Sequence, residues 1–89
     1  MDWRLGLEGA EPNPARGTLK VAFTLASAER ATLEALDVMG RRVARCEVGS
    51  LGAGRHVVDL GTPRLKTGLY FLRLTQAGQM VTTRAVVMR

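Results

Sequence analysis

The stretch LKTGLYFLRL, residues 65–74, gives the clearest indication of the fold. Tyr70, Leu72 and Leu74 stand at every second position, and Gly68 precedes them. Because successive side chains of a strand point to opposite faces, this period of two predicts a strand with one apolar face. We therefore expect a fold built from strands.

Similar runs lie elsewhere in the chain. In LKVAFTL, residues 19–25, the side chains of Leu19, Val21, Phe23 and Leu25 fall on one face. Short extended runs are also predicted at 42–48, 55–60 and 80–88, and the segments between them, GSLGAG, GTPRLKTG and QAGQ, are typical of turns. Six or seven short strands in 89 residues predict an all-β fold, a small antiparallel β-sandwich.

The segment ASAERATLEALDVMG, residues 26–40, has two interpretations. Its alanine, glutamate and leucine content favours a helix that Ser27 would cap and Gly40 would end. As a strand, it would place Ala31, Leu33 and Ala35 inward, with a phase slip at Leu36 as at a β-bulge. Local propensity favours the helix and the rest of the chain favours the strand, so the residues alone leave both open.

The sequence PNP at residues 12–14 marks a boundary, because its two prolines fix φ and remove two backbone donors. We predict a domain at 12–89, and a linker or the end of an upstream cargo protein at 1–11, where the alternation of Trp3, Leu5 and Leu7 allows a short edge strand. The first twelve residues lack the apolar centre of a signal peptide. If the domain is exported, we expect the signal upstream and the chain to be a C-terminal fragment.

The charge balance leaves the choice of partner open. Thirteen lysines and arginines against eight aspartates and glutamates give a net charge of +5. Such a surface suits an anionic partner or is simply solvated. Arg41, Arg42 and Arg45 form the one cluster, without the interleaved aromatic residues that stack on bases, so we predict no nucleic-acid partner. We also predict no integral membrane segment, because no apolar run approaches the ~18 residues that a membrane helix needs.

Residues that could perform chemistry are few. His56 is the single histidine, and Cys46, the single cysteine, cannot form an internal disulfide. No histidine, cysteine or carboxylate has metal-ligand spacing, and GSLGAG lacks the lysine of a phosphate-binding loop. Asp37 and Asp59 are as readily turn or strand-end residues as a catalytic pair. We expect no enzymatic activity, no metal and no cofactor.

The order of these segments resembles a known family. PNP at 12–14 is followed by LKVAFTL, LEALDVMGRRVAR, GRHVVDL, LKTGLYFLRL and TRAVVMR. This order is similar to the C-terminal sorting domain (type A) of the bacterial type IX secretion system, over about residues 11–89. The resemblance implies an immunoglobulin-like β-sandwich, similar to the Ig-like domain of the flagellar hook-capping protein, and implies that residues 31–38 form a strand.

The resemblance also implies a function. Such domains direct an attached secreted cargo through the outer membrane to the cell surface, and are commonly cleaved there. The implied partners are the translocon, shuttle and sortase proteins of the secretion system, and the implied location is secreted or at the cell surface, by way of the periplasm. Two alternatives are an Ig-like structural accessory domain of an extracellular enzyme and a small basic binding domain.

The resemblance assigns roles to individual residues. Those expected to be recognised by the secretion machinery are Pro12, Asn13, Pro14, Leu65, Gly68, Tyr70, Leu72, Arg84, Val86, Val87, Met88 and Arg89, while Asp37, Gly40 and Arg41 are expected to form a structural turn. Two positions depart from the family pattern. Arg84 stands where a lysine is usual, and Leu36 where a tyrosine is frequent. We expect the surface that is read to lie chiefly on the strand at 80–88.

Overall fold

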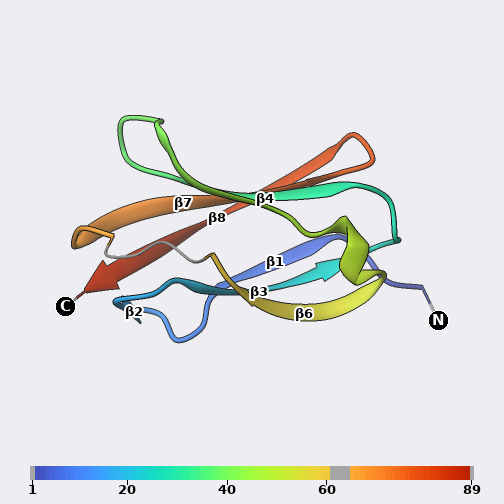
Figure 1. The fold of residues 1–89 in the computed structure, drawn as a ribbon, viewed down its shortest axis with the longest axis horizontal. Coiled ribbons are helices and arrows are strands. Elements are labelled where there is room, and N and C mark those ends of the chain that lie inside the picture. The colour runs from blue at the N-terminus through green and yellow to red at the C-terminus, as the bar shows by residue number, and fades with distance from the viewer. Residues whose placement is uncertain (1, 61–64, 89) are drawn as a thin grey trace.

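The computed structural model describes residues 2–60 and 65–88, which form two β-sheets packed face to face (Figure 1). The predicted all-β sandwich is confirmed. Eight strands are present in the described residues, more than the six or seven predicted, because two short strands precede the strand at 20–25. They are β1 (Gly6–Ala10), β2 (Ala15–Arg16), β3 (Lys20–Leu25), β4 (Ala31–Leu36), β5 (Arg42–Glu47), β6 (Gly54–Asp59), β7 (Gly68–Gln76) and β8 (Gln79–Met88). A short 3₁₀ turn, η1 (Gly49–Leu51), precedes β6.

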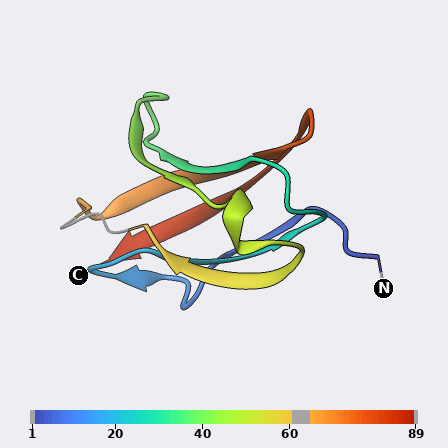
Figure 2. The same cartoon turned by 45° about the vertical axis from the view of Figure 1, so that its right-hand side comes forward.

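One sheet has the strand order β1-β3-β6 and the other β2-β8-β7-β4-β5. Neighbouring strands in the described part are antiparallel, except that β2 runs parallel to β8. The two-residue β2 therefore covers the end of β8, as Figure 2 shows. The residues that directly follow the predicted boundary at PNP therefore lie at the edge of the larger sheet.

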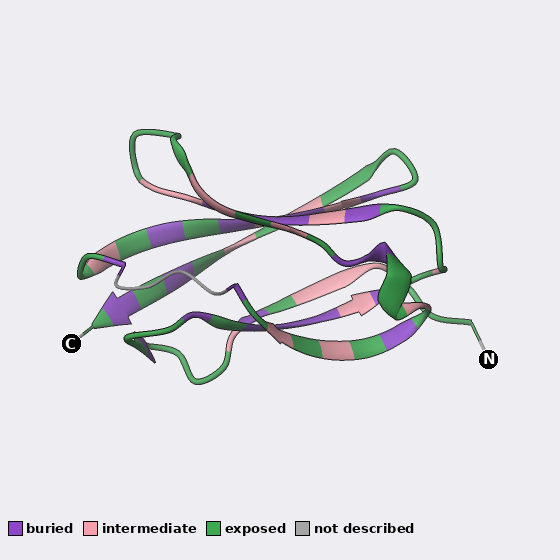
Figure 3. Cartoon of the chain, viewed as in Figure 1, coloured by how far each residue is buried: buried purple, intermediate pink, exposed green. Residues whose placement is uncertain are grey.

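The core lies between the sheets and is formed by alternate residues of the strands (Figure 3). In β7, Tyr70, Leu72 and Leu74 are buried, as their period of two predicts. They pack in the same cluster as Val21, Phe23, Leu25, Leu33 and Val87. Burial of these apolar side chains supplies most of the driving force for folding, since each fully buried one contributes about 1.5–3 kcal/mol.

The ambiguous segment contains β4, so the strand interpretation is confirmed. Ala31, Leu33 and Ala35 are buried, and the register shifts where the sequence shows its phase slip. Ala35 is opposite Ala44 whereas Leu36 is opposite Arg42, which leaves Val43 as the extra residue of a bulge. Hydrogen bonding to both β5 and β7 outweighs the local helical propensity.

Residues before the predicted boundary at residue 12 also belong to the smaller sheet. Gly6–Ala10 forms β1, which pairs with β3 and bulges at Glu8, while Leu5 and Leu7 pack against the core. A short strand is thus present near the one that the alternation allowed, but it begins at Gly6 and includes only Leu7 of the three alternating residues. The boundary between a cargo and the domain stays a prediction.

Candidate recognition surface

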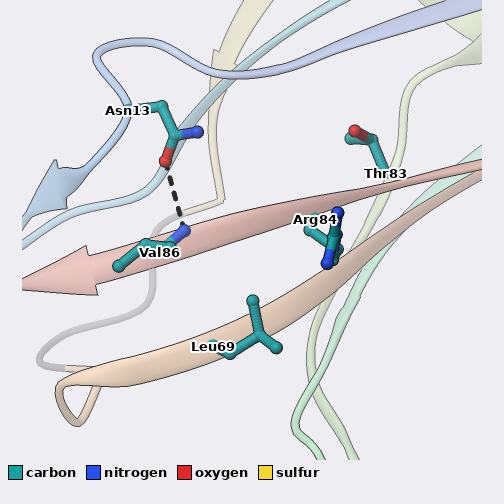
Figure 4. Close-up of a pocket in the computed structure, with 5 residues that line it drawn as sticks. All are labelled: Asn13, Leu69, Thr83, Arg84 and Val86. Carbon is teal, nitrogen blue, oxygen red and sulfur yellow. Dashed lines mark hydrogen bonds between the residues drawn. The ribbon is translucent and has the colours of Figure 1, made fainter.

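The PNP segment lies against β8, far from it in sequence. The side-chain oxygen Oδ1 of Asn13 accepts a hydrogen bond from the backbone N–H of Val86 at 3.2 Å, across 73 residues of sequence (Figure 4). Directly after this contact, Ala15 and Arg16 pair with Val87 and Met88. The two segments at 12–14 and 84–88 that carry the resemblance are therefore neighbours in space.

In the described residues, most of one edge of β8 has no neighbouring strand, and Asn13 lies along that edge. β7 pairs with β8 along its whole length, whereas β2 pairs only with its last two residues. Asn13 satisfies the next donor along that second edge, as a strand would. Beside it, Asn13, Leu69, Thr83, Arg84 and Val86 line a surface pocket (Figure 4).

Most of the predicted recognition residues are either exposed or buried, and within β7 and β8 the two kinds alternate along the strand. Pro12, Asn13, Pro14, Arg84, Val86 and Met88 are exposed, whereas Leu65, Tyr70, Leu72 and Val87 are buried in the core. The peptide bonds before Pro12 and Pro14 are both cis. The buried residues therefore shape the surface without presenting their own side chains. Arg89 lies outside the described residues.

The start of β7 is fixed by Tyr70. Its hydroxyl donates a hydrogen bond to the carbonyl oxygen of Lys66 at 2.6 Å, which ties the strand to the loop before it. Gly68 has a φ of +157°, and nothing lies within 4 Å of the place where its Cβ would stand. The cost of a side chain at this position would thus come from the backbone conformation and not from a steric clash.

The loop between β4 and β5 has the hydrogen bonding that was expected of Asp37. Its Oδ1 accepts hydrogen bonds from the backbone N–H groups of Met39 and Arg41, both at 2.9 Å, and Oδ2 accepts one from Nε of Arg41 at 2.9 Å. Gly40 has a φ of +82°, which favours glycine. The N–H donated by Arg41 is the main cause that lowers the pKa of Asp37.

The outward-facing residues of the larger sheet include two that the sequence analysis did not select, Leu69 and Phe71. Both are 37% exposed because they alternate with the buried Tyr70 and Leu72. In the sheet register Leu69 is opposite Val86, and Phe71 is opposite both Arg84 and Leu36. The signal that could have identified them is an apolar side chain on the solvent face of a predicted strand.

Charged side chains lie on the same face of the larger sheet as Leu69 and Phe71. Glu34 Oε1 accepts a hydrogen bond from Arg73 Nε at 3.0 Å and its Oε2 one from Arg42 at 3.4 Å, with the Arg73 bond as the main cause that lowers the Glu34 pKa. Arg84 and Arg16 have no ion-pair partner among the residues that the structure describes. This face therefore carries uncompensated positive charge.

The groups that could perform chemistry are dispersed. His56 Nε2 lies 2.8 Å from the carbonyl oxygen of Gly52, and its ring packs against Phe23. Cys46 Sγ contacts the carbonyl oxygen of the adjacent Glu47. Over residues 2–60 and 65–88, no group of three histidines, cysteines or carboxylates is placed to hold a metal ion, and no helix is long and apolar enough to span a membrane.

Comparison with known proteins identifies a family whose model matches this chain. The family model described as the secretion system C-terminal sorting domain matches residues 12–88, which is nearly the whole sequence. A search of curated proteins gave no match. The matched range begins at Pro12 and runs through β8, so it contains both segments that Asn13 joins.

Proposed function

Because the chain belongs to the family of type IX secretion C-terminal sorting domains, we propose that it is a non-catalytic module that carries an attached protein through this system to the cell surface. The family match over residues 12–88 is the observation that carries the proposal. The contact between Asn13 and Val86 supports it, because it assembles one surface from the two ends of the matched range.

The function we propose needs binding and no covalent chemistry. The rigid sandwich presents the exposed members of the predicted set, Asn13, Arg84, Val86 and Met88, in a fixed arrangement. A preformed surface binds without the entropic cost of ordering it first. We propose that the translocon, shuttle and sortase proteins of the secretion system bind here, and that nucleic acid does not.

We further propose that the cargo precedes β1 and that a signal peptide on the cargo delivers the whole protein to the periplasm. The sorting domain then directs the cargo across the outer membrane. Since Gly6–Ala10 pairs with β3, a fusion should retain residues 1–11 with the rest of the domain. A junction placed at residue 12 would remove one strand of the smaller sheet.

The test is a reporter fusion in a bacterium that has the type IX system. A reporter enzyme with a signal peptide is joined to residues 1–89, and surface and extracellular reporter activity is measured against the periplasmic pool. We expect delivery to the surface, which fails without the domain and fails in a strain that lacks the translocon. A folded fusion retained in the periplasm of the competent strain would refute the sorting role and favour the structural accessory domain.

A further inference from the structure

Exposed apolar side chains gather on the outward side of the larger sheet. Leu69, Phe71, Val86 and Met88 are 37–40% exposed, and we call these four residues the outer patch. They come from β7 and β8, the two strands with the most extensive pairing in the described fold. Exposed apolar residues that cluster in this way mark interaction sites more often than single ones do.

The register places arginines directly beside the outer patch. Phe71 is opposite Arg84, and Met88 is opposite Arg16 in the parallel pair of β8 and β2. Ala15 and Val87 in that pair are buried, so Arg16 and Met88 both point outward. Glu34, a carboxylate on this face, already accepts hydrogen bonds from Arg42 and Arg73. The outer patch is therefore apolar with an unneutralised basic margin.

The composition of this surface indicates the chemistry of its partner. Phenylalanine, methionine and arginine are enriched in protein–protein interfaces, whereas lysine is depleted. The outer patch and its margin consist of such residues with leucine and valine, and lack the tryptophan, tyrosine and lysine typical of membrane-surface segments. The planar guanidinium of arginine also binds carboxylates through paired hydrogen bonds. An acidic protein surface fits these features better than a lipid surface does.

We propose that the outer patch, with Arg84 and Arg16, is the face that docks on a protein of the secretion machinery whose surface has an apolar centre and acidic residues around it. This inference rests on the proposed function and specifies where the domain is recognised. The residues proposed to contact the partner are the outward-facing ones, which alternate with the buried residues of the family motifs. Leu69 and Phe71 are the new members of the site.

Delivery of the reporter fusion tests the proposal with matched variants. Phe71→Thr and Val86→Thr remove apolar contacts but keep residues that favour strands. Their controls are Val57→Thr, on the exposed side of β6 in the other sheet, and Met80→Thr, at the far end of β8. We expect the two patch variants to lose most surface delivery, and the two controls to match the unmodified fusion.

Charge is tested in the same way. Arg84→Glu should abolish delivery and Arg84→Gln should reduce it strongly, because a carboxylate partner responds to the sign of the charge. Arg84→Lys should retain more delivery than Arg84→Gln but less than the unmodified fusion, since lysine keeps the charge and loses the paired hydrogen bonds. The control Arg30→Glu makes the same change of charge in the exposed loop before β4. Equal loss in Arg84→Glu and Arg30→Glu would show that only net charge matters, and would contradict the proposal.

Crosslinking identifies the partner class. A photo-crosslinking amino acid in place of Leu69 should give adducts with a machinery protein at a segment rich in aspartate and glutamate, whereas the same group in place of Val57 should not. Purified domain should fail to sediment with vesicles of equal parts phosphatidylglycerol and phosphatidylcholine. Adducts at both positions alike, or sedimentation with the vesicles that Arg84→Glu abolishes, would overturn the assignment.

The controls separate this inference from the function beneath it. If the unmodified fusion is not delivered, the proposed function fails. If it is delivered and every patch variant is delivered equally well, the sorting role survives and the docking face is refuted. Circular dichroism of each purified variant shows that it is folded, and Leu69→Thr replaces Phe71→Thr if the latter unfolds.

Discussion

The Asn13 side chain accepts a hydrogen bond from β8 at a position where a neighbouring strand would otherwise accept it. Among the described residues, its oxygen is the contact that covers the Val86 N–H, where β2 has ended its pairing with β8. We expect Asn13→Ala to speed amide exchange at Val86 by about three- to tenfold, since a net hydrogen bond contributes roughly 1 kcal/mol. The neighbouring Ala85 amide is the control, because Ala85 pairs with Tyr70 inside the sheet. Unchanged exchange at Val86 would show that Asn13 does not protect this edge in solution.

Glu34 makes stability depend on pH. Its pKa is lowered in the folded protein, mainly by the hydrogen bond from Arg73. A carboxylate with a lowered folded pKa stabilises the fold above the ordinary glutamate pKa of about 4.3, and this contribution is lost as the pH falls through the folded pKa. Glu34→Gln should therefore lower the free energy of unfolding at pH 7 by about 1 kcal/mol.

Urea unfolding of Glu34→Gln and the unmodified protein at several pH values checks this sign. The difference in the free energy of unfolding between the two proteins should narrow as the pH falls below about 4. The control is Asp2→Asn, at an exposed position near the start of the chain, which should leave the free energy of unfolding within about 0.5 kcal/mol of the unmodified protein. A difference that widens toward acid would mean that the Glu34 carboxylate destabilises the fold.

At the scale of the strand, β8 places neighbouring valines in opposite environments. Val87 is fully buried, whereas Val86 is 40% exposed on the outer patch. Val87→Thr buries a hydroxyl in an apolar core and should lower the free energy of unfolding by about 1–3 kcal/mol. Val86→Thr should change it by less than about 0.5 kcal/mol. Thermal or urea unfolding of this matched pair measures the contrast, and equal losses would mean that the strand register differs from the one described.

Strand alternation also decides how far sequence can predict such elements. The periods of β3 and β7 are regular, so their inward residues followed from the sequence alone. Residues 31–36 were ambiguous because alanine, glutamate and leucine suit a helix locally, and only hydrogen bonding to β5 and β7 decides for a strand. The Asn13–Val86 contact spans 73 residues, and nothing in either local segment indicates it. Leu69 and Phe71 do not follow from the motif, because its period of two marks only the buried side of β7.

Considered as a whole, the sandwich has two unlike exteriors. On the smaller sheet, Arg55 forms ion pairs with Glu8 and Glu11, at 2.8 and 3.0 Å, so the charge of this arginine is neutralised. On the larger sheet, Arg84 and Arg16 remain without an ion pair among the described residues, beside apolar side chains. Charge complementarity orients two proteins as they meet, so we expect the face with Arg84 and Arg16 to be the one that an acidic partner approaches.

Stability and recognition can be separated in the intact fusion, because Val87 is buried in the core whereas Val86 lies on the proposed docking face. Deleting residues 87–89 would remove Val87 from the core, so loss of delivery in that variant would not distinguish unfolding from lost recognition. Substitution avoids this difficulty. Val87→Thr should reduce delivery at the normal growth temperature and recover at a lower one, where the unfolded fraction is smaller. Val86→Thr should stay folded and undelivered at both temperatures, since cooling does not restore a missing contact. The measurement is surface reporter activity at the two temperatures, alongside the periplasmic pool. Recovery of Val86→Thr on cooling would show that Val86 acts through stability, and the docking face would then lose its central residue.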